Sequence, residues 1–431
     1  MESENPARLA VVYDQGAASP SDIARGLKGV ASVRFVVPRS AHVRAVLPLL
    51  EHYGSVSMLD RALATARLPE HADGILTFSE RMVPATARLA EMLGLEYHST
   101  DVAAGLTDKN LQRGLLAKAR IDPIRYRAAE NVAELESALA AVGYPVIVKP
   151  TRGEGSRNTF LIGDASQAAC VIRRLRDRWP ENTMEGGPAV LLAEEYLSGA
   201  PTERGIADYL SIESLATGGR WQHMAIVGNF SQAPSFRETG HFWPAAIDDG
   251  AAERVTGLAD AALGALSARL GLSHTEIKLT PSGPRVIEVH GRLGGDRAAL
   301  FREATGVDLI SLAGTLALGA TPAAALPRPE AVHFRYHHQP PAGTARLLRV
   351  AGQESVRRLP GVGGYTVSKP PVAVYPDSTA YVDTLYGSAG TQRELVELVC
   401  TASRLLTFTF ARAGEAEPIT VNGGDLNPAC A

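Results

Sequence analysis

Cysteine is scarce in this sequence, and long apolar runs are absent from it. The 431 residues include three cysteines, Cys170, Cys400 and Cys430, and no CxxC or Cys/His cluster, so neither a disulfide framework nor a zinc site is indicated. No stretch approaches the ~20 apolar residues of a membrane helix, and the N-terminus has no apolar signal-peptide core. We therefore expect a cytoplasmic protein with reduced cysteines and no membrane partner.

Charge of one sign is not in surplus either. The 43 Lys and Arg residues and 46 Asp and Glu residues give a formal net charge of −3, which argues against a general nucleic-acid binder. The 41 glycines and 27 prolines follow no period, so collagen-like and linker architectures are excluded. A hydrophobic share of 45% is typical of a globular protein, and the length corresponds to about three domain-sized units.

In the first hundred residues, buried apolar runs alternate with amphipathic helical patterns. This part has no GxGxxG, so dinucleotide binding is not indicated. The alternation is typical of a parallel sheet with helices on both faces, which predicts an α/β fold. We expect strands at 8–14, 32–38 and 73–80 and helices at 20–30, 42–53 and 80–94.

The pattern changes at about residue 107. A Pro/Ala-rich stretch at 319–330 is typical of a linker or a domain-edge loop, and the polar tail after Ala411 is expected to be loosely ordered. The expected helices are 107–121, 131–143, 166–179, 251–270, 296–319 and 393–405. The expected strands are 143–150, 159–163, 188–197, 208–217, 222–230, 274–280 and 284–291.

A glycine-containing loop follows the strand that ends at Lys149-Pro150. The segment VIVKPTRGEGSRN (146–158) carries Gly153 and Gly155, whose backbone lets N–H groups converge on an anion, while the lysine supplies a point charge for a phosphate. The segment is not a GxxxxGK[ST] loop, so an ordinary P-loop NTPase is disfavoured. A hairpin turn with a surface lysine is the alternative.

Glu276 and Glu288 fall on the two strands of a predicted hairpin. Alternation puts Glu276 on one face with His274, and Glu288 on one face with Val286 and His290. Two facing carboxylates repel each other unless a cation lies between them, and Mg²⁺ with nucleotide phosphates is such a cation. The pair therefore predicts a metal site, and two solvent-facing glutamates are the alternative.

Three further segments carry polar residues that a reaction could use. Arg292 could stabilise charge on a transferring phosphoryl group, or could form a structural ion pair beside a helix N-cap at Asp296. The strand LLAEEYLSG (191–199) could be a hinge beside a base or an exposed edge strand. The segment SFRETGHFWP (235–244) is interpreted as a loop, which could cover a polar ligand or lie on the surface.

The order of these segments resembles the ATP-grasp superfamily of carboxylate–amine ligases. The resemblance rests on Asp108-Lys109, YPVIVKP with GEGSRN, AEEYLSG and the TEIKLT/VIEVHGRLGG pair, and it spans about residues 74–308. Through DYLSIESLATGG, FRETGHFWP and HTEIKLT, the chain looks most like L-amino acid ligases of the bacilysin-synthetase (alanine–anticapsin ligase) type. This implies an α/β protein, α+β in its ATP-binding part, with ATP between two antiparallel sheets.

The resemblance also implies a division of the chain. A Rossmann-like domain would be followed by a lid, a larger subdomain with the metal site, and a C-terminal subdomain. Relatives are often dimers, so a homodimer is an expectation. The implied boundaries are 1–105 for the Rossmann-like domain, 106–190 for the lid, 191–325 for the large subdomain, 326–411 for the C-terminal subdomain and 412–431 for a flexible tail.

The resemblance assigns roles to individual residues of this sequence. Those implied to bind ATP are Lys109, Lys149, Gly153, Glu154, Gly155, Ser156, Glu194, Glu195 and Leu197, with Glu203 or Asp208 for the ribose. Those implied to hold Mg²⁺, as two ions, are Glu276 and Glu288. Those implied to face the substrates are Glu238, His241, Arg292, Gly295 and Asp296. Those implied to be catalytic are Arg292, Lys149 and Ser156.

Two positions depart from the superfamily's pattern. His290 stands where many members have an asparagine metal ligand, so a third ligand is in doubt. Asp296 stands where the alanine-specific ligases have a bulky aromatic residue that restricts one substrate to small side chains. An acid there would leave more room and could attract a cationic group, so we expect a pocket that is not restricted to small residues.

The expected activity is ATP-dependent formation of an amide bond between an amino acid or related carboxylate and an amine. The reaction would pass through an acyl phosphate and release ADP and phosphate. One alternative is a carboxylase or purine-type ligase that acts on bicarbonate or formate. Another is a nucleotide-binding module without turnover, although such a site would be expected to lose some of the lysines, carboxylates and arginine that are present here.

Overall fold

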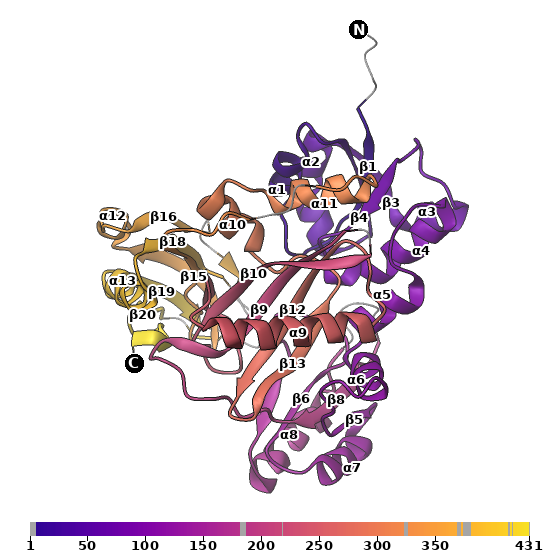
Figure 1. Cartoon of the computed structure of the whole chain (residues 1–431). Coiled ribbons are helices and arrows are strands. Elements are labelled where there is room, and N and C mark those ends of the chain that lie inside the picture. Colours follow the sequence, from indigo (N-terminus) through magenta and orange to yellow (C-terminus); the bar gives the residue numbers. More distant parts are fainter. Residues whose placement is uncertain are drawn as a thin grey trace.

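The computed structural model describes residues 6–430 except 182–186, 218, 323–325, 369–371, 374–380, 413 and 416. Part of the predicted linker, residues 323–325, therefore lies outside the described residues. Within them, the strands form four sheets flanked by helices (Figure 1), which confirms the predicted α/β class. Among the described helices, none has both the length and the apolar composition needed to cross a membrane.

The N-terminal sheet is parallel, as the alternating pattern predicts, and its strand order is β3-β2-β1-β4. Leu9 and Val11 point into one core with α1 and α2, while Ala10 and Val12 point into another with α3 and α4. The elements are β1 (Arg8–Val12), α1 (Pro20–Leu27), β2 (Ser32–Val37), α2 (Ala41–Tyr53), β3 (Ser55–Met58), α3 (Leu59–Thr65), β4 (Gly74–Leu76) and α4 (Val83–Leu93). The sequence patterns did not predict β3 or α3, which are short.

A tight turn after β4 brings one acidic residue to the carboxyl edge of this sheet. The Thr77 hydroxyl donates to the Val12 carbonyl at 2.6 Å and accepts from the Ser79 amide at 3.1 Å. The 3₁₀ helix η1 (Glu80–Met82) begins directly afterwards. Glu80 therefore lies at the edge of the sheet where α/β proteins usually bind ligands.

The predicted helix 107–121 corresponds to α6 (Lys109–Lys118), and α5 (Thr100–Thr107), which the sequence patterns did not predict, ends just before it. Asp108 separates them, because its carboxylate accepts hydrogen bonds from the amides of Asn110 (3.0 Å) and Leu111 (3.1 Å). This N-cap fixes the start of α6 and places Lys109 in its first turn.

A small antiparallel sheet with the order β5-β8-β6-β7 carries α7 and α8 on one face. Val146 and Val148 point into the core beneath these helices, so Ile147 and Lys149 point to the opposite face. The elements are β5 (Tyr126–Ala129), α7 (Val132–Val142), β6 (Val146–Pro150), β7 (Phe160–Ile162), α8 (Ala165–Asp177) and β8 (Leu191–Glu195).

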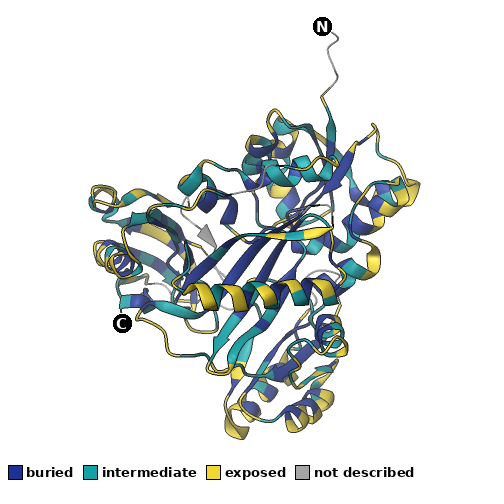
Figure 2. Ribbon diagram, viewed as in Figure 1, coloured by how far each residue is buried: buried dark blue, intermediate teal, exposed yellow. Residues whose placement is uncertain are grey.

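An eight-stranded sheet forms the centre of the molecule, and α9 (Asp249–Ala265) lies across one of its faces (Figure 1). Figure 2 shows the middle of this sheet, including most of β9, buried and the outer side of α9 exposed. The strands, in spatial order, are β13 (Gly283–His290), β12 (Leu272–Thr280), β9 (Ile206–Thr217), β10 (Arg220–Phe230), β11 (Gly240–Trp243), β14 (Val332–Tyr336), β18 (Asp383–Ala389) and β16 (Val362–Val367).

Two details of this sheet correct the sequence-based expectations. Residues 240–243, expected in a loop, form β11 between β10 and β14. On β13, a register shift makes Glu276 pair with Glu288 but Ile277 pair with Val286. This irregularity turns the Val286 side chain into the core, so Val286 and Glu288 do not share a face.

The predicted helix 296–319 forms two helices in the structure, α10 (Arg297–Thr305) and α11 (Leu309–Ala317). Gly306 ends α10 with φ +77°, and the Asp308 carboxylate caps α11 by accepting from the Ile310 amide at 2.9 Å. Helix α11 then packs on α1 of the N-terminal sheet, where Gly26 leaves room for Ile310.

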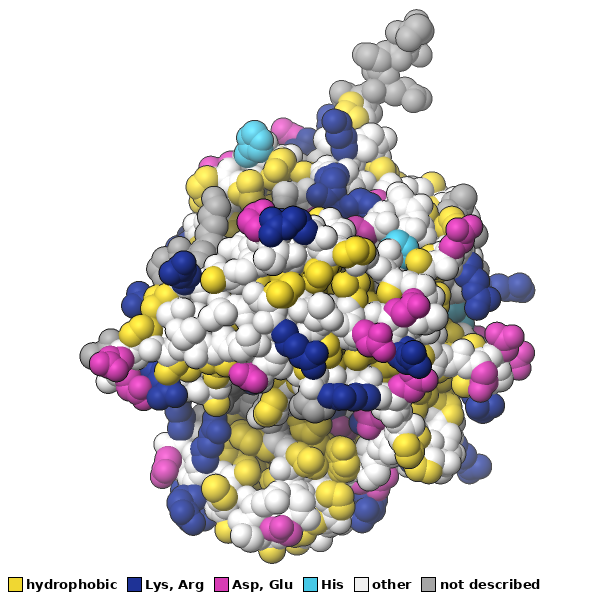
Figure 3. Space-filling model, turned by 90° about the vertical axis from the view of Figure 1, so that its left-hand side faces the viewer, with side chains coloured by type: hydrophobic (Ala, Val, Ile, Leu, Met, Phe, Trp, Pro, Cys, Tyr) yellow, Lys and Arg dark blue, Asp and Glu magenta, His cyan; other side chains and the backbone are white. Residues whose placement is uncertain are grey.

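The C-terminal part adds a sheet with the order β17-β15-β19-β20. The expectation of a flexible tail after Ala411 is wrong for much of that segment, because Ile419–Asn422 pairs with β19 and Ala429 is buried. The elements are β15 (Thr344–Ala351), α12 (Gln353–Arg357), β17 (Val372–Ala373), α13 (Gln392–Arg404), β19 (Thr407–Arg412), β20 (Ile419–Asn422) and η2 (Pro428–Cys430). On the face drawn in Figure 3, acidic and basic side chains are interspersed, as the small net charge suggests.

Candidate active site

A cavity of about 690 Å³ is lined by the small sheet, the β12–β13 hairpin and the carboxyl edge of the N-terminal sheet. It brings together residues from segments that are far apart in the sequence. The predicted site residues that line it are Lys109, Lys149, Gly153, Glu154, Gly155, Ser156, Glu194, Glu195, Leu197, Glu238, Glu276, Glu288, Arg292 and Gly295. The cavity therefore contains charged side chains of both signs.

Three predicted site residues lie away from this wall. Glu203 is exposed in the loop before β9. His241 is buried on β11, and burial together with Arg297 holds its pKa well below the usual value, so its imidazole is neutral. The Asp296 carboxylate lies 2.8 Å from His337 Nε2 and 3.6 Å from the Arg335 guanidinium Nε, so it already has close partners of its own.

The two predicted metal carboxylates face each other across the hairpin. Glu276 and Glu288 are direct register partners, and both line the cavity. Although burial by itself raises the pKa of Glu288, Lys109 and His290 bring that pKa down to about 2. The Glu276 pKa is also lowered, because nearby His274 and His290 outweigh the effect of burial. Both side chains are therefore anionic at neutral pH.

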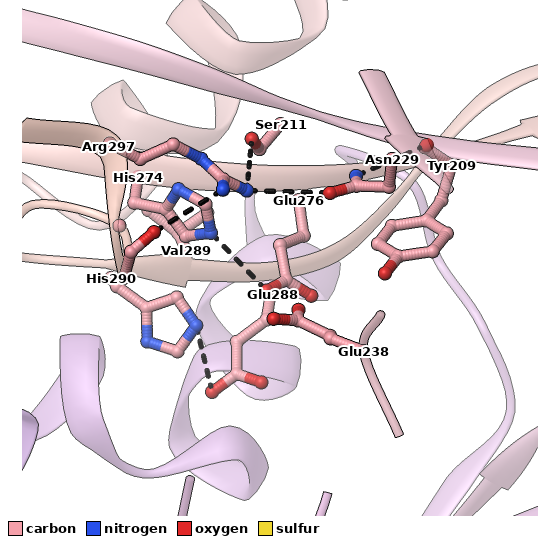
Figure 4. Close-up of polar contacts among 12 residues, drawn as sticks. Tyr209, Ser211, Asn229, Glu238, His274, Glu276, Glu288, Val289, His290 and Arg297 are labelled. Carbon is pink, nitrogen blue, oxygen red and sulfur yellow. Dashed lines mark hydrogen bonds and ion pairs between the residues drawn. The ribbon is translucent and has the colours of Figure 1, made fainter. Parts of the chain in front are cut away.

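Each of these carboxylates lies beside a histidine, His274 or His290 (Figure 4), and each histidine contacts a second, deeply buried glutamate. We call Glu276, His274 and Glu213 the first histidine arm: His274 Nδ1 lies 2.5 Å from Glu213 and Nε2 lies 3.3 Å from Glu276. Burial lowers the His274 pKa, but Glu213 and Glu276 outweigh it and raise the pKa to about 9, so the imidazole is positive.

The second histidine arm consists of Glu288, His290 and Glu80. His290 Nδ1 lies 3.1 Å from Glu80, and His290 Nε2 lies 3.6 Å from Glu288. The same Glu80 carboxylate pairs with Arg292 Nε at 2.8 Å. Burial would raise the Glu80 pKa, but His290 and Arg292 hold it below its usual value. Glu80 therefore positions both His290 and Arg292, and no sequence motif pointed to it.

Lys109 links α6 to the hairpin and to the glycine-containing loop. Its ammonium lies 2.8 Å from a Glu288 oxygen and donates to the Gly153 carbonyl at 3.1 Å. Burial would lower the Lys109 pKa, but Glu288 raises it above the usual value. The lysine is thus a fixed positive charge between the loop and the carboxylate pair.

Lys149 belongs to a buried ion network that joins two sheets. Its ammonium lies 2.5 Å from Glu194, which also pairs with Arg113 at 3.0 Å. Arg113 in turn donates to the carbonyls of Val286 and Ile287, each at 2.9 Å, at the irregular point of β13. Arg113 therefore fixes the small sheet against the hairpin. The sequence reasoning missed it, because a single arginine in an amphipathic helix carries no motif.

The loop between β6 and β7 is tied down on two sides. Gly155 has φ +67°, a conformation that glycine adopts without strain. The Ser156 hydroxyl donates to the Phe236 carbonyl at 2.8 Å, and Glu154 pairs with Arg81 at 2.8 Å. These contacts hold the loop over the cavity.

The segment at the end of β8 also lines the cavity. Glu195, Tyr196 and Leu197 line it, and Arg125 holds the Glu195 carboxylate at 2.8 Å. Asp208 does not line the cavity, but it pairs with the cavity-lining Lys278 at 2.6 Å.

The donor set suits a divalent cation that brings its own phosphate and water ligands. The described residues contain no cluster of three or more His, Cys, Asp or Glu side chains arranged around one ion. Glu276 and Glu288 nevertheless offer two anionic carboxylates on one cavity wall, beside two lysines. Mg²⁺ is usually held in this way, by one or two carboxylates together with substrate phosphates.

Comparison with a protein-family model and with known proteins agrees with this geometry. Residues 142–299 match the model of the ATP-grasp domain. That range contains Lys149, the glycine-containing loop, Glu194, both hairpin carboxylates and Arg292. The predicted resemblance to the ATP-grasp superfamily is therefore confirmed.

Among the relatives, alanine–anticapsin ligase of Bacillus subtilis (strain 168) is 29% identical over 250 residues, 56% of this chain and 53% of that protein. The chain thus spans about half the length of the first curated relatives that it matches. The structure of L-amino acid ligase from Bacillus licheniformis has a TM-score of 0.77, 21% identity, and coverage of 96% of this chain and 100% of that one. Carboxyaminoimidazole ribonucleotide synthase from Aspergillus clavatus, complexed with ATP, has a TM-score of 0.71, 15% identity, and coverage of 93% and 98%.

Proposed function

We propose that this chain, which contains an ATP-grasp domain, is an ATP-dependent ligase that forms an amide bond between an amino acid or related carboxylate and an amine. The reaction would proceed through an acyl phosphate and release ADP and phosphate. The observation that carries the proposal is the facing pair of Glu276 and Glu288 in one cavity with Lys109, Lys149 and Arg292. The names of the relatives, alanine–anticapsin ligase and L-amino acid ligase, support it.

ATP fits this cavity in size and charge. A volume of about 690 Å³ falls in the range of ordinary ligand pockets, ~300–1,000 Å³. Lys109 and Lys149 would contact the phosphates, and Gly153–Ser156 would cover them through backbone amides. Glu195 and Leu197 would line the base at the end of β8. For the ribose we favour Asp208 over Glu203, because Asp208 lies beside the cavity-lining Lys278 and Glu203 is exposed.

Glu276 and Glu288 would hold Mg²⁺, in one or two ions, against the phosphates. When bound, the metal neutralises phosphate charge and helps to align the attacked phosphorus. The protein contributes orientation and fixed charge, since phosphoryl transfer needs positioning more than a protein nucleophile.

Arg292 would stabilise the charge that develops on the acyl phosphate and on the tetrahedral intermediate. Its position is fixed by Glu80, so the guanidinium is already directed when the substrate arrives. The loop held by Ser156 and Glu154 would exclude water, which matters because a free acyl phosphate hydrolyses.

The proposal is tested by ADP release. The purified chain is incubated with MgATP and pairs of the twenty standard L-amino acids, ADP is measured with a coupled assay, and products are identified by mass. We expect amino acid-dependent ADP release with a product whose mass is the sum of two amino acids less one water. A chain that releases no ADP above the no-substrate control with any pair would contradict the proposal.

A carboxylase-type activity is the second candidate, because the fold is also similar to a carboxyaminoimidazole ribonucleotide synthase. The same assay with bicarbonate and aminoimidazole ribonucleotide in place of amino acids separates the two candidates. ADP release that depends on bicarbonate, and not on any amino acid, would favour this alternative.

A further inference from the structure

Arg297, the first residue of α10, lies buried in the cavity wall with weak partners. It is 3% exposed and lines the cavity. Its nearest acceptors are Ser211 Oγ at 3.3 Å, Asn229 Oδ1 at 3.4 Å, the Gly295 carbonyl at 3.3 Å and Glu213 Oε1 at 3.4 Å. Within the described residues, its Nε has no hydrogen-bond partner. Charge-assisted hydrogen bonds are normally about 2.7–2.9 Å long, so this guanidinium is held loosely.

The other buried arginines of this site differ from Arg297. Arg292 lies 2.8 Å from Glu80, and Arg113 lies 3.0 Å from Glu194. Each of those guanidinium groups has a carboxylate oxygen within 3.0 Å, although Glu80 also pairs with His290 and Glu194 with Lys149. For Arg297 the corresponding distance is 3.4 Å. Arg297 shares Glu213 with His274, which lies closer, at 2.5 Å.

Arg297 has no carboxylate at close range. Its guanidinium is positive at any ordinary pH, and its nearest carboxylate among the described residues, Glu213, lies 3.4 Å away. A buried charge with so distant a partner is costly unless a further anion reaches it.

We propose that Arg297 binds the carboxylate of the amine-donating substrate, the carboxylate that stays free in the product. This inference rests on the proposed function and names the substrate class as α-amino acids rather than simple amines. Figure 4 supports the choice of carboxylate: Arg297 points toward Ser211 and Asn229, apart from Glu288 and His290. The carboxylate that is phosphorylated must instead lie beside the metal site and Arg292.

The test compares amino acids with their carboxamides, which keep the size and lose the charge. Binding of the twenty L-amino acids and of their carboxamides is measured by calorimetry with MgADP present, in the wild type, Arg297→Met and Arg302→Met. Arg302 is a matched control, since it lies on the same helix, 3.3 Å from Asp308 and away from the cavity. Thermal unfolding verifies that each variant folds. If Arg297→Met does not fold, Arg297→Lys takes its place, because lysine retains the charge but cannot donate two parallel hydrogen bonds to a carboxylate.

We expect the wild type to bind at least one amino acid about 10–100-fold more tightly than its carboxamide, as a charge-assisted hydrogen bond implies. Arg297→Met, or Arg297→Lys in its place, should lose most of this preference, and Arg302→Met should keep it. In turnover, the KM of the amine donor should rise far more than kcat falls. A wild type without acid preference, or a folded Arg297 variant that keeps it, would overturn the inference.

The two proposals can fail separately. Selective binding through Arg297 without any ADP release would contradict the ligase and leave the carboxylate site standing. ADP release with equal use of acids and carboxamides would support the ligase and contradict the role of Arg297.

Discussion

The two histidine arms contain the same groups, glutamate–histidine–glutamate, but they are assembled differently. In the first arm, Glu213 on β9 and His274 on β12 are direct register partners in one sheet. In the second, His290 lies on β13, whereas Glu80 comes from η1, 210 residues earlier in the chain. The inner contact is 2.5 Å in the first arm and 3.1 Å in the second.

This difference indicates what each arm depends on. The first arm follows from strand register alone, so it forms whenever the sheet forms. The second arm forms only when the N-terminal sheet packs against the hairpin. Since Glu80 also fixes Arg292, the N-terminal part contributes directly to the geometry of the site.

The largest effect is expected from replacing Glu276 or Glu288, the members of the two arms that line the cavity. Glu276→Gln and Glu288→Gln should each reduce the rate of ADP formation by on the order of 10³-fold or more, because each would remove one of the two anionic ligands proposed for Mg²⁺, a contribution of several kcal/mol. The check is single-turnover ADP formation at saturating MgATP, with Glu253→Gln on the exposed side of α9 as the control. If either variant retains more than a tenth of the wild-type rate, that carboxylate is not a metal ligand.

The buried end of the first arm should matter chiefly for stability. Glu213→Gln leaves the Arg297 guanidinium buried beside His274 without a carboxylate, and breaking a buried ion pair in this way costs about 3–5 kcal/mol. Chemical denaturation of the folded variant measures the change. A loss below about 1 kcal/mol would mean that Glu213 does not compensate these two cations.

The buried end of the second arm should matter more for turnover. Glu80→Gln keeps the shape but removes the charge that directs Arg292, so we expect kcat to fall about 10–100-fold with a smaller change in the KM for ATP. Steady-state kinetics measure both constants. If Glu80→Gln and Glu213→Gln lost the same amount of stability and both kept the wild-type kcat, the two arms would not differ in their roles.

Acid should act near the second arm before the first. Burial lowers the pKa of His98 to about 4, and its ring lies against Gly291, the residue that follows His290 in the sequence. The unfolded chain binds a proton at His98 near pH 6.5 and the folded chain does not, so stability is full above pH 6.5 and falls between pH 6.5 and 4. The loss from this one residue is at most on the order of 3 kcal/mol.

The measurement compares the unfolding free energies of wild type and His98→Gln at several pH values. Other groups titrate in both proteins, so the informative quantity is the difference between them. As the pH falls from 6.5 to 4, the unfolding free energy of the wild type should decrease relative to that of His98→Gln. A constant difference over this range would show that His98 takes up its proton equally in the folded and unfolded chains.

The sequence predicted the hairpin with Glu276 and Glu288, the glycine-containing loop and the parallel N-terminal sheet, because each depends on local periodicity or spacing. It did not predict the irregular register at Val286, since a bulge depends on the partner strand. Glu80, Arg113, Glu213 and Arg297 were also missed, because their roles arise from packing between distant segments. Asp296 was expected to face a substrate, but its partners Arg335, on β14, and His337, directly after β14, belong to a segment that no motif connected to it.

The smallest expected effect concerns Arg81, the residue next to Glu80. Arg81 pairs with Glu154 of the glycine-containing loop at 2.8 Å, but both side chains are partly exposed, at 21% and 26%. A pair of this kind contributes about 0.2–1 kcal/mol, so Arg81→Met should raise the KM for ATP only about two- to five-fold. The ratio of the variant's KM to the wild-type KM should be larger at low salt, because salt screens the ion pair that the variant lacks. Steady-state kinetics at two ionic strengths provide the measurement, with Glu154→Gln expected to match. If Arg81→Met instead lowered kcat as strongly as Glu80→Gln, the N-terminal part would act mainly through the loop, and the second histidine arm would not be its principal contribution to the site.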